Sequence, residues 1–218
     1  MVYLIKYDDE NAFKSSEKNL QVITTKVPGA ALVLDTNKSK YNGPVDLELT
    51  YDVTSTTTPT KIYATNAYLH IEDLLSIKVD DKLYPISSFT ASNSYTFDTL
   101  GEHKVVLRYK SLINLGKSEA TTRNGSFESC RNLVSVVIPG GVKYIEGNCF
   151  AYCSNLSSIT SLSTSAPFQR TNTIFQGVKQ NGTLYVLSGS TGYGNGYMGW
   201  LSTNMYYLGS QGWTLTEI

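Results

Sequence analysis

The chain is poor in the residues that most often carry chemistry. Only two of its 218 residues are histidines and three are cysteines, and neither the C-x-x-C nor the H-x-x-x-H spacing of a zinc site occurs. The G-x-S-x-G pattern that positions a nucleophilic serine is missing as well. The sequence therefore predicts no metal site, no cofactor and no enzymatic activity.

A surplus of either charge and a long apolar run are missing too. Lysine plus arginine and aspartate plus glutamate both number 18, so the formal net charge is zero. Nucleic-acid-binding proteins carry a basic face, and this composition argues against such a partner. No apolar run reaches the roughly 20 residues that a membrane-spanning helix needs, so no membrane span is predicted.

The most informative stretch lies between residues 127 and 159. The pattern F-x-x-C-x-x-L begins at Phe127 and again at Phe150, 23 residues later. A weaker copy begins at Phe175. Repetition at a fixed period of this size predicts a solenoid, because each repeat buries its apolar face only against the next. The predicted repeat core comprises Phe127, Cys130, Leu133, Val136, Ile138, Val142, Ile145, Phe150, Cys153, Leu156, Ile159 and Phe175.

Each repeat contains the residues that one coil needs. A short strand is expected from Leu133, with Pro139 ending it and Gly140-Gly141 turning the chain. Cys130 and Cys153 occupy equivalent positions and are expected to be buried as small apolar groups. Three cysteines do not form a complete disulfide set; a bond between Cys130 and Cys153 is geometrically allowed, but a stacked position needs none.

Upstream of the repeats the pattern changes to that of isolated strands. Residues 45–53 alternate between apolar and charged or polar side chains, which predicts a half-buried strand. A tight turn is expected at Asp80-Asp81, and a hairpin across Gly101 is expected to join strands at 94–97 and 104–109. His103, close to that hairpin, is expected to be solvated. Short strands at this spacing predict an antiparallel sandwich.

At these residues the chain resembles the BspA-type leucine-rich repeat, a family common in surface proteins of gut bacteria and their phages. The run from Phe127 to Ile145 carries the repeat, residues 95–109 are similar to the Ig-like β-hairpin region that often precedes it, and residues 181–214 are similar to its closing segment. Only two clean repeats are present. The resemblance implies a mainly β protein, with an antiparallel Ig-like β-sandwich followed by a short leucine-rich-repeat solenoid.

The expected organisation has three parts. Residues 1–44 are assigned to N-terminal strands, at 2–7, 20–26 and 30–35, or to an attachment segment. Residues 45–112 are assigned to the Ig-like sandwich, and residues 113–218 to the repeat domain with its C-terminal cap.

Three aromatic residues near the C-terminus are candidates for contact with a ligand or partner. Tyr193, Tyr197 and Trp200 lie in a glycine-rich stretch that lacks the preceding strand and following helix of a phosphate-binding loop. Aromatic rings present an apolar face on which a sugar can stack. The alternative is that these rings close the open end of the solenoid.

These observations predict a non-catalytic structural or adhesion module on an extracellular surface. The first hypothesis is a bacteriophage virion component, such as a head or tail fibre or a decoration protein, because Met1 leads into no recognisable secretion signal. The alternatives are a secreted or lipid-anchored bacterial surface adhesin and a carbohydrate-binding module of a polysaccharide-uptake system.

The expected partner is a protein of the virion or cell surface, or a host-surface glycan. A homo-oligomer, such as the trimer common among fibres, is compatible with the sequence, although no heptad period specifies one.

Overall fold

The structure is a computed structural model that describes residues 20–21, 34–35, 43–64, 69–116, 125–197 and 199–218. The chain divides into two compact units, residues 1–42 and 43–218. In the first unit, β1 (Leu20–Gln21) pairs antiparallel with β2 (Leu34–Asp35). These short strands lie within the strands predicted at 20–26 and 30–35, whereas the strand predicted at 2–7 lies outside the described residues.

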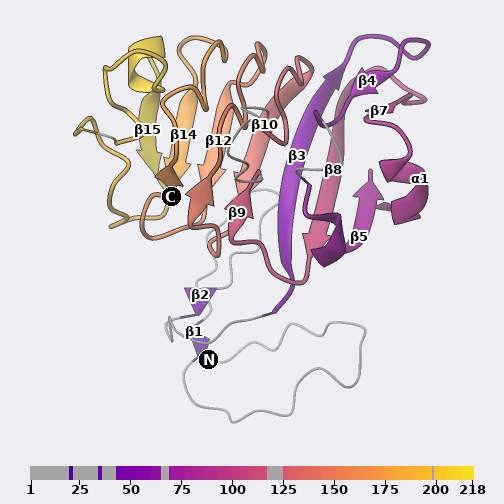
Figure 1. The fold of residues 1–218 in the computed structure, drawn as a ribbon, viewed down its shortest axis with the longest axis horizontal. Coiled ribbons are helices and arrows are strands. Elements are labelled where there is room, and N and C mark those ends of the chain that lie inside the picture. Colours follow the sequence, from indigo (N-terminus) through magenta and orange to yellow (C-terminus); the bar gives the residue numbers. More distant parts are fainter. Residues whose placement is uncertain (1–19, 22–33, 36–42, 65–68, 117–124, 198) are drawn as a thin grey trace. The chain divides into compact units, whose positions relative to one another are not determined.

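An eight-stranded sheet organises the second unit, with the order β15-β14-β12-β10-β3-β8-β5-β6 (Figure 1). The first four strands run parallel, and the last four run antiparallel to their neighbours. The two halves meet where β10 pairs antiparallel with β3. The parallel strands are β10 (Leu133–Ile138), β12 (Ser158–Ser161), β14 (Thr183–Val186) and β15 (Thr214–Glu217). The antiparallel strands are β3 (Val45–Val53), β8 (Gly101–Tyr109), β5 (Leu74–Val79) and β6 (Lys82–Tyr84).

The strand predicted at residues 45–53 is confirmed as β3, and its alternation is the reason. Leu47, Leu49, Tyr51 and Val53 are at most 1% exposed, while the residues between them are partly exposed. Tyr51 satisfies its buried hydroxyl by donating to the carbonyl of Ile62 at 2.5 Å. One face of β3 therefore belongs to the core and the other to the surface.

The tight turn predicted at Asp80-Asp81 is also confirmed. Both residues have positive φ, 48° and 65°, and they join β5 to β6. A two-residue hairpin with positive φ at both central positions matches the right-handed twist of its strands, and aspartate tolerates this conformation better than most residues.

The repeat segment forms coils that stack in register. Val136 of β10 lies beside Ile159 of β12, 23 residues on, and Ile159 lies beside Leu184 of β14, 25 residues on. A second, three-stranded parallel sheet has the order β13-β11-β9. Its strands are β9 (Asn114–Leu115), β11 (Tyr144–Ile145) and β13 (Phe168–Gln169). The pairs β9 and β10, β11 and β12, and β13 and β14 thus each place one strand in each sheet, whereas β15 belongs to the eight-stranded sheet alone.

The arrangement of residues 45–112 differs from the predicted sandwich. Four of its strands belong to the same sheet as the repeats, and that sheet runs across the predicted boundary at residue 112. The hairpin predicted across Gly101 is wrong, because β7 (Ser94–Tyr95) pairs with β4 (Thr60–Lys61) instead. The physical reason is that β8 is already hydrogen-bonded to β3 on one edge and to β5 on the other.

Helices are short in the described part of the chain. The α-helix α1 (Ile86–Thr90) buries Phe89, and 3-10 turns occur at η2 (Ile71–Asp73) and η3 (Gly209–Gln211). Within the described residues no helix combines the length and apolarity that crossing a membrane requires.

Candidate interaction surface

A column of stacked aromatic rings supports the repeat half of the molecule. Phe127 and Phe150 are nearly parallel, with ring centroids 5.6 Å apart and planes at 9°, and Phe150 and Phe175 are 6.0 Å apart at 2°. Trp200 follows at 5.1 Å from Phe175, tilted by 54°. All twelve residues of the predicted repeat core are at most 1% exposed. The strands on the surface of this core are therefore held at a fixed spacing.

The outer face of the eight-stranded sheet is continuous from one edge to the other. The strand registers place one residue from each strand in a single row, and none of these residues is buried. In spatial order the row consists of Leu83, Lys78, Val106, Glu48, Val137, Thr160, Tyr185 and Thr216.

A neighbouring row on the same face is made of hydroxyl residues. Thr50 of β3 is followed across the sheet by Ser135, Ser158, Thr183 and Thr214. Adjacent strands lie about 4.8 Å apart, so these hydroxyl groups form a regular line. On the four parallel strands the two rows contain no charged residue, and their polar groups are hydroxyls that both donate and accept hydrogen bonds.

The antiparallel half of the outer face carries ion pairs. The Nζ of Lys104 on β8 lies 2.5 Å from Oε2 of Glu48 on β3, and the Nη1 of Arg108 lies 3.8 Å from Oδ2 of Asp46. These side chains are between about a third and a half exposed, so the pairs add little to stability. The face therefore has a charged half and an uncharged, hydroxyl-rich half.

Two of the three aromatic residues proposed for ligand contact are not on the surface. Trp200 is fully buried and Tyr193 is 2% exposed, while Tyr197 is 90% exposed. The indole N–H of Trp200 donates to the carbonyl of Pro167, and the Tyr193 hydroxyl donates to the carbonyl of Ser163. The polar atoms of Trp200 and Tyr193 are satisfied inside the protein, which lets the two rings pack against each other and lets Trp200 pack against Phe175.

The three cysteines are free and buried. Burial raises the pKa of Cys130 and Cys149 above the ordinary thiol value and raises that of Cys153 to about 12. The Cys153 thiol donates to the carbonyl of Phe127, 3.0 Å away in the preceding coil. Reactive cysteines need an exposed thiolate, so these groups act as packing residues.

The expectation that His103 is solvated is wrong, since the residue is 8% exposed. Its Nδ1 donates to Asp80 Oδ2 at 2.6 Å, and its Nε2 lies 2.9 Å from the carbonyl and 3.2 Å from the hydroxyl of Thr99. Nε2 donates to the Thr99 carbonyl or accepts from the Thr99 hydroxyl, according to the protonation of the ring. These contacts tie the segment at Thr99 and the turn at Asp80 to His103 of β8. Among the described residues no cluster of His, Cys, Asp and Glu could hold a metal ion.

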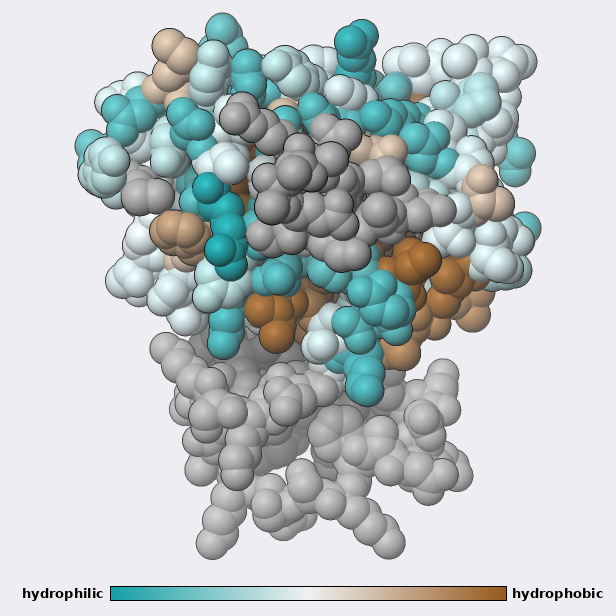
Figure 2. Space-filling view, in the orientation of Figure 1, coloured by the Kyte–Doolittle hydropathy of each residue, from teal (hydrophilic) through white to brown (hydrophobic). Residues whose placement is uncertain are grey.

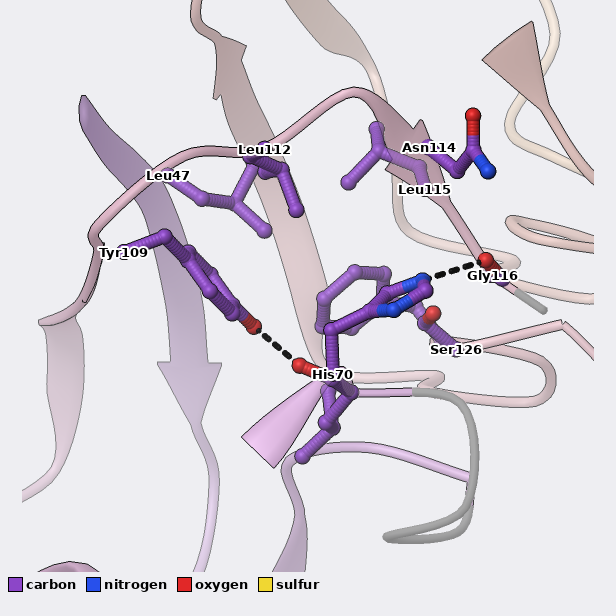
Figure 3. Close-up of a pocket in the computed structure, with 10 residues that line it drawn as sticks. Leu47, His70, Tyr109, Leu112, Asn114, Leu115, Gly116 and Ser126 are labelled. Carbon is purple, nitrogen blue, oxygen red and sulfur yellow. Dashed lines mark hydrogen bonds between the residues drawn. The ribbon is translucent and has the colours of Figure 1, made fainter. Parts of the chain in front are cut away.

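A closely packed pocket lies where the two halves of the second unit meet (Figure 3). His70 has a left-handed backbone, φ 49°, and its Nε2 donates to the carbonyl of Gly116 at 2.7 Å. Tyr109 donates to the carbonyl of Leu69 at 2.8 Å. The space that remains is too small for a water molecule. The side chains that line this pocket therefore pack the surrounding elements together and leave no room for a ligand.

A wider groove lies beside the sheet edge at β6. It has a volume of about 640 Å³ and is lined by Leu75, Ser76 and residues 83–87. Leu75 and Leu83 are 49% and 64% exposed. Figure 2 shows a cluster of apolar residues on this side of the molecule, in the region of β5 and α1.

Comparison with known protein families identifies the repeat segment. Residues 108–179 match the family described as BspA type leucine rich repeat region (6 copies). No match was found among curated proteins, and none among solved structures. The matched residues extend from the end of β8 to just past Phe175. Residues 108–179 are therefore similar to BspA-type leucine-rich repeats, a type that suggests a surface or protein-interaction module and is typically non-catalytic.

Proposed function

We propose that this protein is a non-catalytic binding module displayed on an extracellular surface and that it makes contact through the outer face of its eight-stranded sheet. The observation that carries the proposal is the unbroken row of unburied side chains across all eight strands. A face of this breadth on a stacked scaffold offers many contacts at fixed spacing to a large partner. The repeat region is of a type associated with surface and protein-interaction roles.

The same proposal places the protein in a bacteriophage particle, as a head or tail fibre or a decoration protein. The repeat type suggests a surface or protein-interaction module, and such a module suits a virion as well as a bacterial cell surface. The test is mass spectrometry of purified virions and of bacterial outer-membrane fractions from the producing strain. Peptides of this chain in virions at a structural stoichiometry are the expected result. Their presence in the outer membrane alone would overturn the virion placement in favour of a cell-surface adhesin.

The contact surface is tested separately with charge substitutions. Thr160→Lys and Thr183→Asp introduce charges on partly exposed positions of the uncharged half of the face without touching the core. Binding to target cells or particles is expected to fall while the melting temperature stays close to that of the parent protein. Lys179→Asp is the matched control, because Lys179 is exposed and lies outside both rows. Unchanged binding by both face variants would refute the assignment of this surface.

A further inference from the structure

A second surface, separate from the outer face of the eight-stranded sheet, has features that packing alone does not explain. It lies on the three-stranded sheet and comprises Ile113, Lys143, Tyr144, Phe168 and Arg170, which we call the side patch. Phe168 is 51% exposed and Ile113 is 52% exposed, although most large apolar residues of this unit are buried. They flank β11 on opposite sides, since the amide of Lys143 donates to the carbonyl of Ile113 and its carbonyl accepts from the amide of Phe168.

Arg170 is held rigidly at this surface. Its Nε donates to Glu146 Oε1 at 3.0 Å, and its guanidinium carbon lies 4.6 Å from the centre of the Tyr144 ring. The Glu146 side chain is only 5% exposed, whereas that of Arg170 is 44% exposed. The carboxylate therefore fixes the guanidinium from below, and the aromatic ring fixes its plane. An arginine fixed in this way gives up little side-chain entropy when a partner binds.

The buried carboxylate is hard to justify by stability alone. Taking a charge pair out of water costs about as much as the pair returns, so an apolar pair of similar size would serve the fold as well. The pair does have a definite geometric effect. It uses the Nε–H of Arg170 inside the protein while the guanidinium stays partly exposed, and guanidinium N–H groups bind carboxylates in a two-point geometry.

The charges of the side patch favour an anionic partner. Lys143 is exposed beside Tyr144, and Arg170 lies in the neighbouring coil, next to the exposed Phe168. Among the described residues, the acidic partner of Arg170 is Glu146, which is already paired and buried. The patch thus presents two cations framed by two exposed apolar side chains. Tyrosine, phenylalanine and arginine are also enriched in protein interfaces.

We propose that the side patch binds a partner protein through a short segment that combines acidic and apolar side chains. One carboxylate contacts Arg170, with Lys143 adding to the attraction, and the neighbouring apolar side chain packs between Phe168 and Ile113. This site does not overlap the rows of the eight-stranded sheet, so a chain bound there leaves that face free. The protein then has two binding surfaces, and the partner at the side patch is recognised by its negative charge.

The experiment uses the full chain and two fluorescein-labelled hexapeptides followed by fluorescence polarisation. The first peptide is Asp-Leu-Phe-Asp-Leu-Gly, and the second replaces both aspartates with asparagine. The acidic peptide is expected to bind about tenfold more tightly than the amide peptide, which corresponds to one well-formed charged contact. Its affinity is expected to fall as salt is raised, because partly exposed charges are screened.

Three variants and one control variant locate the binding site. Phe168→Ser and Lys143→Gln alter exposed side chains, so both should fold, and each is expected to weaken binding of the acidic peptide by about fivefold or more. Leu100→Ser is the control, because Leu100 is 64% exposed, lies outside both proposed binding surfaces and should leave binding unchanged. Arg170→Lys keeps the charge but loses the planar two-point contact. Its affinity for the acidic peptide is expected to lie between that of the parent protein and that of Lys143→Gln.

Three outcomes would overturn the proposal. Equal binding of the two peptides would show that the charge of the peptide is not recognised. Unchanged binding by Phe168→Ser would show that the peptide does not bind at the side patch. Binding of polygalacturonate that depends on Phe168, with neither peptide bound, would replace a protein partner with an acidic glycan.

Discussion

Removing the middle ring of the aromatic column is the sharpest test of the fold. Phe150 is fully buried and stacks on Phe127 on one side and on Phe175 on the other. Truncating a buried phenylalanine to alanine costs about 3–5 kcal/mol, and each aromatic pair adds about 0.5–1.5 kcal/mol beyond area burial. Because Phe150→Ala loses two ring contacts, we expect a cost near 5 kcal/mol.

The size of this effect decides whether the protein folds at all. Domains are stable by only about 5–15 kcal/mol, so Phe150→Ala should shift the urea midpoint strongly or leave the repeat half unfolded at room temperature. Phe127→Ala, which loses one phenylalanine contact in place of two, should cost about 1 kcal/mol less. The measurement is equilibrium urea unfolding followed by tryptophan fluorescence, since Trp200 lies at the end of the column.

Phe168→Ala is the matched control, because the same substitution at a half-exposed position should stay within about 0.5 kcal/mol of the parent. A double-mutant cycle adds a second check: Phe127 and Phe150 should couple by about 0.5–1.5 kcal/mol. A cost for Phe150→Ala no larger than that of the control would refute the argument that stacked rings hold the coils together.

Two further predictions concern ionisation and backbone strain. The protein should lose stability at alkaline pH, because Cys130, Cys149 and Cys153 have raised pKa values when folded and ionise near pH 8.5 once unfolded. The contribution of the protonated thiols to the free energy of unfolding is intact below that pH and decreases as the pH rises toward about 12. The decrease is about 1.4 kcal/mol per pH unit for each thiol. Urea midpoints at pH 7.5 and 10.5 measure it. A Cys153→Ala variant with the same pH slope as the parent would contradict this. Ser129→Gly should stabilise the protein by about 0.5–1 kcal/mol, because Ser129 has φ 60°, a conformation that glycine adopts without cost. Gly177→Ala should instead destabilise the protein, because Gly177 has φ 69° and a Cβ there would lie 3.1 Å from the Tyr152 ring. Thermal melts of both variants test these predictions. A lower melting temperature for Ser129→Gly and a higher one for Gly177→Ala would disprove the strain argument.

The parts of the fold with a regular sequence pattern could be predicted. The alternation in residues 45–53 indicated one buried face, and the 23-residue repeat indicated which residues stack. Asp80-Asp81 was recognisable as a turn because few other residues tolerate positive φ. In each case the information lies within a few neighbouring residues or in a repeat of fixed period.

The pairing of distant strands could not be predicted in this way. Alternation shows that β3 has a buried face, but it does not show that Leu49 lies beside Val136, 87 residues away, rather than in a separate sandwich. The outer-face rows depend on that pairing, so sequence reasoning missed them, although the outward polar residues of β3 were visible. The sequence left two interpretations open for Tyr193 and Trp200 for a related reason: an aromatic residue in a glycine-rich stretch fits a surface or a closed end equally well.

The pairing of β3 with β10 has a consequence for how this architecture can vary. An antiparallel strand closes one flank of the parallel stack, and each coil touches only the coils on either side of it. Excising residues 150–174 as a block would bring Phe175 over Phe127 and Thr183 beside Ser135 while leaving the closed flank as it is. The number of coils can therefore vary, and the contact face can become wider or narrower by whole coils without any change in the pairing of β3 with β10.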